Sequence, residues 1–222
     1  RVANHKINFS DGAWLREKGN GKFNLSETYL LIDRLLVAEG LEHKGRFKET
    51  VFKFIREICG AKSWVDYFHD RTKYIFTGKG VFCDLHATNC GYTLMLASWL
   101  YGDEMPAELH KLIRDNVSRR VIDPYRAYVK NGKTGFGMWW ICDKYNWNPA
   151  NNAKIAGITM LLSESPTERA WILATAIRQI MLYINAYPED GYCGEGMDYW
   201  SYGFGNYVSF AELIRLETGG KI

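Results

Sequence analysis

The residues that could do chemistry gather in one stretch, AYPEDGYCGEGMDYWSYGFG at residues 186–205. It combines aromatic rings with four carboxylates and five glycines, and it lies between two segments with a helical pattern. A plain link between helices is usually about 2 to 8 residues long and needs none of these groups. Aromatic rings suit the apolar faces of sugars, and acids suit their hydroxyls. We therefore interpret this stretch as a surface that holds a ligand.

A second stretch of the same character is MWWICDKYNWNPANN at residues 138–152. It contains four asparagines: Asn146, Asn148, Asn151 and Asn152. Three tryptophans stand beside them: Trp139, Trp140 and Trp147. An amide near the start of a helix can cap that helix, or it can donate hydrogen bonds to the carboxylate of a ligand. Capping explains one or two of the four, so the pattern indicates a binding role for the others.

The composition sets limits on the class of protein. The 222 residues are 47% hydrophobic and 24% charged, which predicts a single globular domain over residues 1–222. The net charge of +3 is too small to indicate nucleic acid binding, and no apolar run predicts a membrane span. Five cysteines without a C-x-x-C pair argue against a disulfide framework and a zinc site. Because the chain begins at Arg1 without methionine, we expect it to be part of a longer protein.

Helical periodicity dominates the sequence, and strand signals are weak throughout. Start and stop signals, such as the pair Ser165 and Pro166, predict about seven main helices and therefore an all-α fold. Their approximate ranges are 26–38, 47–59, 82–101, 106–117, 152–162, 167–186 and 200–217.

Short and long connections alternate between these helices. The short ones are 39–45, 102–105 and 163–166, and the long ones are 60–81, 122–151 and 187–199. Short links imply antiparallel neighbours, so every second connection should lie at the same end of the helical array. We expect the three long, aromatic-rich connections to share one rim, on which a rigid scaffold displays functional loops.

Three motifs occur in an order that resembles a known family. They are CDLHATNCGYTLMLASWLYGDEMP at 83–106, NWNP at 146–149 and DGYCGEGMDYWSYGFG at 190–205. The chain looks like the N-terminal α/α-toroid domain of heparinase II/III-like polysaccharide lyases, over roughly residues 80–220. The resemblance implies an incomplete toroid of helical hairpins, followed in the full protein by a C-terminal β-sandwich. It also implies a periplasmic or secreted bacterial protein that binds an acidic polysaccharide without a metal or cofactor.

Such lyases cleave uronic-acid polysaccharides by β-elimination, and the resemblance assigns catalytic roles to residues of this chain. The asparagine that faces the uronate carboxylate matches Asn146, with Asn148 as its neighbour. The catalytic tyrosine of a Tyr-Gly pair matches Tyr202, with Tyr199 as the second choice. A phenol has an ordinary pKa near 10, so we expect Tyr202 to act as the acid that protonates the leaving oxygen.

One position departs from the family pattern. Several members carry histidine directly after the asparagine, whereas this chain has Trp147, so the general base is open. His86 and His69 are candidates, because both lie near one end of the helix at 82–101. The residues expected to contact substrate are Trp139, Trp140, Trp147, Asn148, Glu195, Trp200 and His69.

Two other classes of function remain open. A helical-barrel glycoside hydrolase would use Glu195 with Asp198 or Asp190, since hydrolysis needs two carboxyls about 5 to 10 Å apart. The aromatic rim could also belong to a non-catalytic module that binds carbohydrate. The sequence does not distinguish which uronate polymer is bound, or internal from terminal attack.

Overall fold

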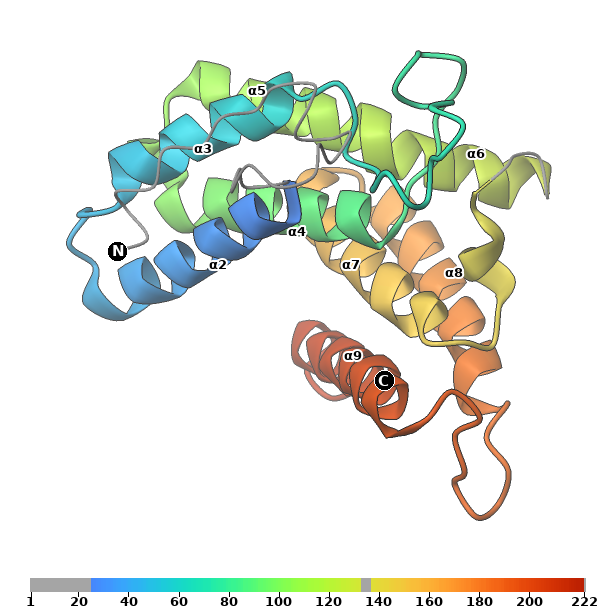
Figure 1. Cartoon of the computed structure of the whole chain (residues 1–222). Coiled ribbons are helices and arrows are strands. Elements are labelled where there is room, and N and C mark those ends of the chain that lie inside the picture. Colours follow the sequence, from blue (N-terminus) through green and yellow to red (C-terminus); the bar gives the residue numbers. More distant parts are fainter. Residues whose placement is uncertain (1–24, 133–136, 222) are drawn as a thin grey trace. The chain divides into compact units, whose positions relative to one another are not determined.

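The computed structural model describes residues 25–132 and 137–221. Over these ranges the chain forms helices and connections with no strand, which confirms the all-α prediction (Figure 1). None of the helices described is both long and apolar enough to cross a bilayer. The described residues form two compact units, with the boundary between Tyr125 and Arg126. The single-domain prediction and the toroid stay predictions.

The N-terminal unit is built around helices α2 (Leu25–Glu42), α3 (Lys48–Gly60), α4 (Leu85–Tyr101) and α5 (Ala107–Val117). Helix α2 packs on α3 and α4, and α5 packs on α3 and α4 (Figure 1). The helical periodicity of α3 correctly predicts its inward face, because its apolar side chains are buried. Those side chains are Val51, Phe52, Phe54, Ile55 and Ile58.

Helix α5 does not end where the sequence predicts. It continues through a π-helical turn (Ser118–Ile122) into α6 (Asp123–Asn131), so the expected connection from 122 to 151 is partly helical. Proline ordinarily breaks a helix, because it lacks an N–H and its ring clashes with the preceding turn. Here the Asp123 N–H donates to Ser118 O, five residues back, and this wider turn makes room for Pro124. Counting 107–131 as one run, the described residues form seven helices.

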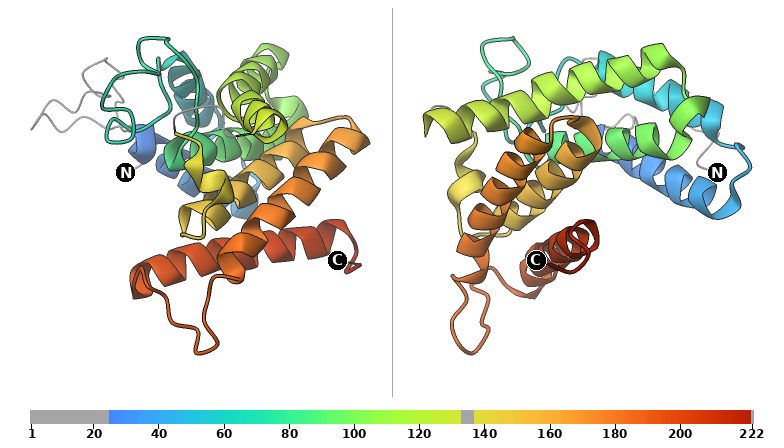
Figure 2. Two further views of the ribbon diagram at one scale, coloured as in Figure 1. Left: turned by 90° about the vertical axis from the view of Figure 1, so that its right-hand side faces the viewer. Right: turned by 180° about the vertical axis from the view of Figure 1, so that it is seen from behind.

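The C-terminal unit contains α7 (Trp147–Leu162), α8 (Pro166–Ile184) and α9 (Met197–Glu217), preceded by a short 3₁₀ turn (Trp139–Cys142). Helix α9 lies crosswise to α7 and α8 (Figure 2). The three helices share a core of Ala153, Ala156, Ala176, Ile180, Phe210 and Ile214. The alanines on α7 and α8 let these helices approach closely, and the larger side chains of α9 fill the remaining space.

The N-terminal ends of α7 and α8 can be compared with the starts predicted from local sequence signals. Helix α8 begins as predicted, since the Ser165 side chain accepts a hydrogen bond from Glu168 N and Pro166 lies in the first turn. Helix α7 begins at Trp147, five residues before the predicted start at Asn152. Pro149 falls in its first turn, where a backbone N–H has no helical partner in any case. Residues 147–149 of the NWNP run are therefore helical, and Asn146 directly precedes the helix.

Candidate functional site

The centre of the candidate site is a pair formed by Asn146 and Glu195. Asn146 precedes α7 and is 4% exposed, and Glu195 belongs to the loop between α8 and α9. The backbone N–H of Asn146 donates to Glu195 Oε2 at 2.9 Å, and its side-chain Nδ2 donates to Oε1 at 2.6 Å. Asn146 thus donates one hydrogen bond to each oxygen of the same carboxylate. The resemblance implies this kind of binding for a ligand, and here the protein's own glutamate supplies the carboxylate.

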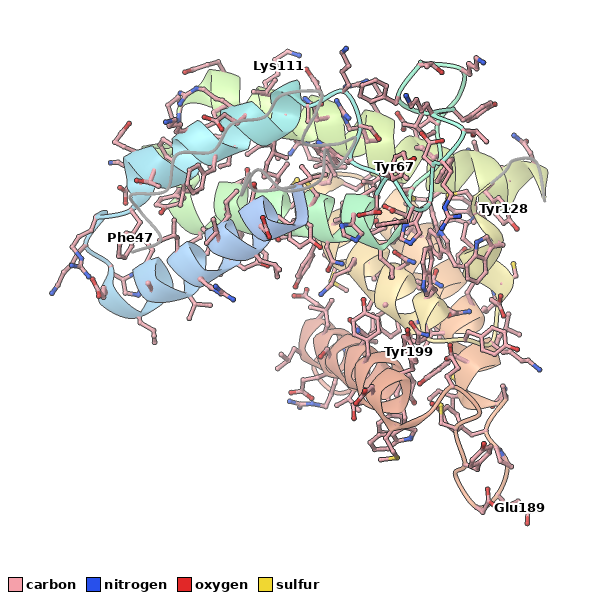
Figure 3. The ribbon with its side chains drawn as sticks, in the orientation of Figure 1. Phe47, Tyr67, Lys111, Tyr128, Glu189 and Tyr199 are labelled. Atoms are coloured by element: carbon pink, nitrogen blue, oxygen red, sulfur yellow. The ribbon has the colours of Figure 1, made fainter. Side chains whose placement is uncertain are left out.

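Helix α9 packs against Asn146 of this pair at a glycine, Gly203. A Cβ atom at Gly203 would lie 3.1 Å from Cβ of Asn146 and 2.8 Å from Cζ of Tyr183. The absence of a side chain therefore allows the backbone of α9 to pack directly against Asn146. Tyr202 immediately precedes this contact and is 39% exposed. Tyr199, labelled in Figure 3, lies one turn earlier on α9. It is 55% exposed. The structure thus brings the helical turn that carries Tyr202 to Asn146.

Two cavities adjoin the loop between α8 and α9, whose tip carries Glu189 (Figure 3). The smaller has a volume of about 270 Å³, and its wall contains two charged residues, Lys144 and Glu195. The larger has a volume of about 850 Å³, and four of its ten lining residues are aromatic, Trp200 and Phe204 among them. Three residues line both cavities: Tyr187, Tyr192 and Cys193.

The sequence did not predict a network of polar groups in the wall of the smaller cavity. The hydroxyls of Tyr183 and Tyr187 are hydrogen-bonded to each other, and Tyr187 Oη donates to Cys193 Sγ at 3.9 Å. Burial, followed by the bonds to Tyr183 and Cys193, raises the pKa of Tyr187 far above the ordinary phenol value. Tyr187 is therefore a neutral hydrogen-bonding group at any physiological pH. Its place in the aromatic stretch 186–205 was the available signal.

The prediction that Asn148 binds substrate is wrong. Asn148 is fully buried, and its Nδ2 contacts three carbonyl oxygens of the protein. These belong to Ile141 at 3.3 Å, Asp143 at 2.6 Å and Gln179 at 2.9 Å. The amides of Asn151 and Asn152 also donate internally, to Trp147 O and to Asn148. All four asparagines therefore make hydrogen bonds within the protein, and Asn146 makes its bond to a carboxylate.

The tryptophans divide into buried and accessible ones. Trp140 is fully buried, so its predicted contact with a sugar is wrong and its role is packing. Trp139 is 48% exposed and stacks on the half-buried Trp147, with ring centroids 5.1 Å apart. Trp200 stacks on Phe204 at 5.3 Å in the wall of the larger cavity. These rings are accessible, and their contact with a ligand stays a prediction.

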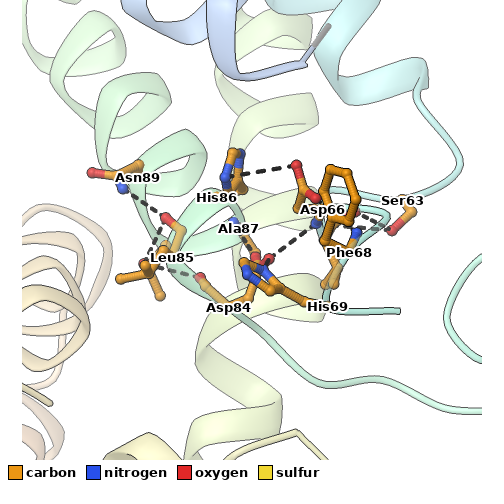
Figure 4. Close-up of polar contacts among 11 residues, drawn as sticks. Ser63, Asp66, Phe68, His69, Asp84, Leu85, His86, Ala87 and Asn89 are labelled. Atoms are coloured by element: carbon orange, nitrogen blue, oxygen red, sulfur yellow. Dashed lines mark hydrogen bonds and ion pairs between the residues drawn. The ribbon is translucent and has the colours of Figure 1, made fainter. Parts of the chain in front are cut away.

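The two candidate histidines lie in the N-terminal unit. His69 Nδ1 is 2.6 Å from Oδ2 of the buried Asp84, which also accepts from the backbone N–H of Asp66 at 2.9 Å (Figure 4). Oδ1 of Asp84 caps α4 by accepting from Ala87 N. His86 Nε2 is 3.8 Å from Asp66 Oδ2. The predicted roles of His69 and His86 as base stay predictions.

Charge governs the protonation of His69. Its burial opposes the charged form, but the bond to Asp84 and the charges of Asp84 and Asp66 outweigh burial and raise the pKa of His69 above its usual value. The His86 ring lies beside it, with centroids 6.0 Å apart. The carboxylate thus orients the imidazole and favours its protonated form.

The three carboxylates of the hydrolase alternative differ in exposure and in hydrogen-bond partners. Asp198 is exposed in the first turn of α9, whereas both oxygens of Glu195 are bonded to Asn146. Asp190 Oδ1 accepts from the Tyr192 N–H within the loop, and Asp190 lines the larger cavity. Within the described ranges, no three His, Cys, Asp or Glu side chains are grouped to hold a metal ion.

No protein-family model matches the chain, and a search of the curated proteins likewise finds no match. The functional assignment therefore depends on the sequence motifs and on the geometry of the C-terminal unit.

Proposed function

We propose that the chain is the α/α-toroid domain of a polysaccharide lyase that cleaves a uronic-acid polysaccharide by β-elimination. The observation that carries this proposal is the contact at Gly203, which joins the carboxylate-binding Asn146 to the helical turn bearing Tyr202. The proposal includes the acidic polysaccharide as ligand, a C-terminal β-sandwich elsewhere in the full protein, and a periplasmic or secreted bacterial location.

The chemistry of β-elimination requires a group that binds the carboxylate and a group that donates a proton. A base removes the proton on C5 of the uronate, a double bond forms between C4 and C5, and the bond from C4 to the 4-oxygen breaks. The uronate carboxylate must be neutralised while negative charge develops beside it, which preorganised N–H donors accomplish. The backbone N–H and Nδ2 of Asn146 are two such donors on one residue.

The leaving oxygen needs a proton, and Tyr202 is the proposed donor. Its side chain is 39% exposed, so a bound polymer can reach it. A phenol can protonate an alkoxide leaving group without a large change in its own pKa. Tyr199, one turn earlier and more exposed, is the alternative donor.

The cavities supply surfaces for the sugar rings. Trp200 and Phe204 present stacked aromatic rings in the larger cavity, and Asp190 adds a carboxylate that can accept from sugar hydroxyls. Lys144 adds a positive charge to the smaller cavity, which suits a polymer of uronates. This combination of rings and isolated charges supports an acidic carbohydrate as ligand.

The test is the formation of an unsaturated uronate, which absorbs in the near ultraviolet, from heparan sulfate, chondroitin, hyaluronan or alginate. Absorbance that Tyr202→Phe abolishes supports both elimination and the role of Tyr202. New reducing ends without this absorbance would instead indicate a hydrolase that uses Glu195. Neither signal, with sugar binding retained, would indicate a non-catalytic carbohydrate-binding module.

A further inference from the structure

The carboxylate of Glu195 occupies the same donors that a ligand carboxylate would require. We infer that Glu195 is an internal stand-in for the ligand, and that a sugar acid binds in the smaller cavity by displacing Glu195 from Asn146. This inference rests on the proposed function, since it takes an acidic sugar as the ligand. It adds a competition within the protein that sets the affinity of the site.

The contact has the geometry of carboxylate recognition. Glu195 places one oxygen on the backbone N–H of Asn146 and the other on Nδ2, at 2.9 and 2.6 Å. The two residues are 49 positions apart, so the contact joins a loop to the start of a distant helix. Any carboxylate of similar width can make the same two bonds. The donors of Asn146 are thus chemically indifferent to whether the carboxylate belongs to the protein or to a sugar.

The position of Glu195 makes exchange possible. Glu195 lines the smaller cavity, whereas Asn146 is buried behind it. A ligand in that cavity therefore meets Glu195 first, and removal of the Glu195 side chain would open the Asn146 donors to the cavity. Lys144 lies in the same wall, two residues before Asn146, and offers a charge to the arriving carboxylate.

The loop is built so that Glu195 can leave. The backbone hydrogen bonds of its tip are local, from Gly191 N to Pro188 O and from Gly196 N to Cys193 O. Gly191 and Gly196 have φ values of +73° and +92°, and a Cβ at Gly194 would meet nothing within 4 Å. A local loop of this kind can shift Glu195 while α8 and α9 stay in place. The displaced carboxylate would then face water.

The experiment is a calorimetric titration of the full chain with glucuronate and galacturonate, each matched by its neutral sugar, glucose or galactose. Glu195→Ala removes the competitor, and Glu195→Gln keeps the size of the side chain but turns a donor toward Asn146. Glu189→Ala is the matched control, because Glu189 is an exposed carboxylate at the tip of the same loop and lines neither cavity. Circular dichroism shows whether each variant is folded.

We expect Glu195→Ala to lower the Kd for one of the sugar acids about tenfold or more, because the apparent Kd is the intrinsic Kd divided by the open fraction. The Kd of Glu195→Gln should fall between those of the wild type and Glu195→Ala, and Glu189→Ala should match the wild type. Neutral sugars should show no gain. Lys144→Met should weaken binding of the acid and leave that of the neutral sugar unchanged.

Weaker or equal binding of the acid by both Glu195 variants, in folded protein, would overturn the inference, as would no binding by any variant. The results also distinguish a failure of this inference from a failure of the proposed function. If Glu195→Ala tightens binding but no polymer is cleaved, the lyase proposal fails and the inference stands. If a polymer is cleaved and Glu195→Ala does not tighten binding, only the inference fails.

Discussion

Gly203 on α9 lies against the ring of Tyr183 on α8 so closely that a Cβ atom at position 203 would fall 2.8 Å from Cζ of that ring. The Tyr183 ring cannot retreat easily, because it is buried and its hydroxyl is bonded to Tyr187. Gly203→Ala should therefore destabilise the protein by about 1 to 3 kcal/mol through overpacking, and it should impair sugar binding by displacing α9 from Asn146. Thermal unfolding and calorimetric titration measure these two effects.

Gly205→Ala is the matched control for Gly203→Ala. It lies on the same helix, and a Cβ there would meet nothing within 4 Å. Alanine forms helix better than glycine, so this change should be neutral or stabilising by up to about 1 kcal/mol. Equal effects of the two substitutions would contradict the importance of the Gly203 contact.

Asn148 organises the C-terminal unit by joining three carbonyl groups. Asn148→Ala should lower the free energy of unfolding by about 3 kcal/mol, because the carbonyl oxygens of Ile141, Asp143 and Gln179 lose a donor. Chemical denaturation measures the change. Asn206→Ala is the control, since that amide donates to Tyr202 O on an exposed stretch of α9 and should cost less than about 1 kcal/mol. A small effect at Asn148 would reopen its assignment to ligand binding.

The bond between His69 and Asp84 should make stability depend on pH. Because the folded-state pKa of His69 is raised above its ordinary value of 6.5, its contribution is fully present below that value and is lost as pH rises through the folded pKa. His69→Gln should therefore destabilise the chain more at a pH of about 5.5 than at about 8.5. Denaturant unfolding at both pH values measures this difference. If His69→Gln destabilises the protein equally at both pH values, or more at high pH, the result would contradict the described geometry.

The cysteines should differ sharply in reactivity. Burial raises the pKa of Cys59 to about 12 and those of Cys83 and Cys90 well above the ordinary value, so little reactive thiolate forms. Cys142 is exposed, and Cys193 is half-buried in the shared cavity wall. Iodoacetamide should modify these two in the folded protein and all five after unfolding, as peptide mass mapping can show. A bound sugar acid should slow Cys193 and leave Cys142 unchanged.

Local signals were sufficient to predict most of the helical order. The start of α8 at Ser165 and Pro166, and the buried face of α3, follow from capping chemistry and period alone. The predicted helix boundaries were wrong near two prolines. Pro124 follows a π-helical turn and Pro149 lies in the first turn of α7, and in both places the missing N–H has little cost. Whether a turn widens before a proline depends on its packing, which the pattern does not show.

The site was predicted less completely than the fold. The order of motifs indicated Asn146 and Tyr202, but the sequence could not show that Glu195 fills the donors of Asn146, because the two are 49 residues apart. Residue type also cannot separate a buried ring from an exposed one, so Trp140 and Trp139 received the same role although one is buried and the other 48% exposed. Long-range contacts decide both questions.

The most direct test of the central claim is near-ultraviolet absorbance during incubation with a panel of uronic-acid polymers. The full-length protein, Tyr202→Phe and Tyr199→Phe should be compared, since the two tyrosines lie one turn apart on α9 and each loses only a hydroxyl. The account predicts that one polymer gives rising absorbance with the wild type and Tyr199→Phe, and that Tyr202→Phe loses most of this rate. A Tyr202→Phe protein as fast as the wild type would contradict the role of Tyr202, and reducing ends without absorbance would contradict elimination itself.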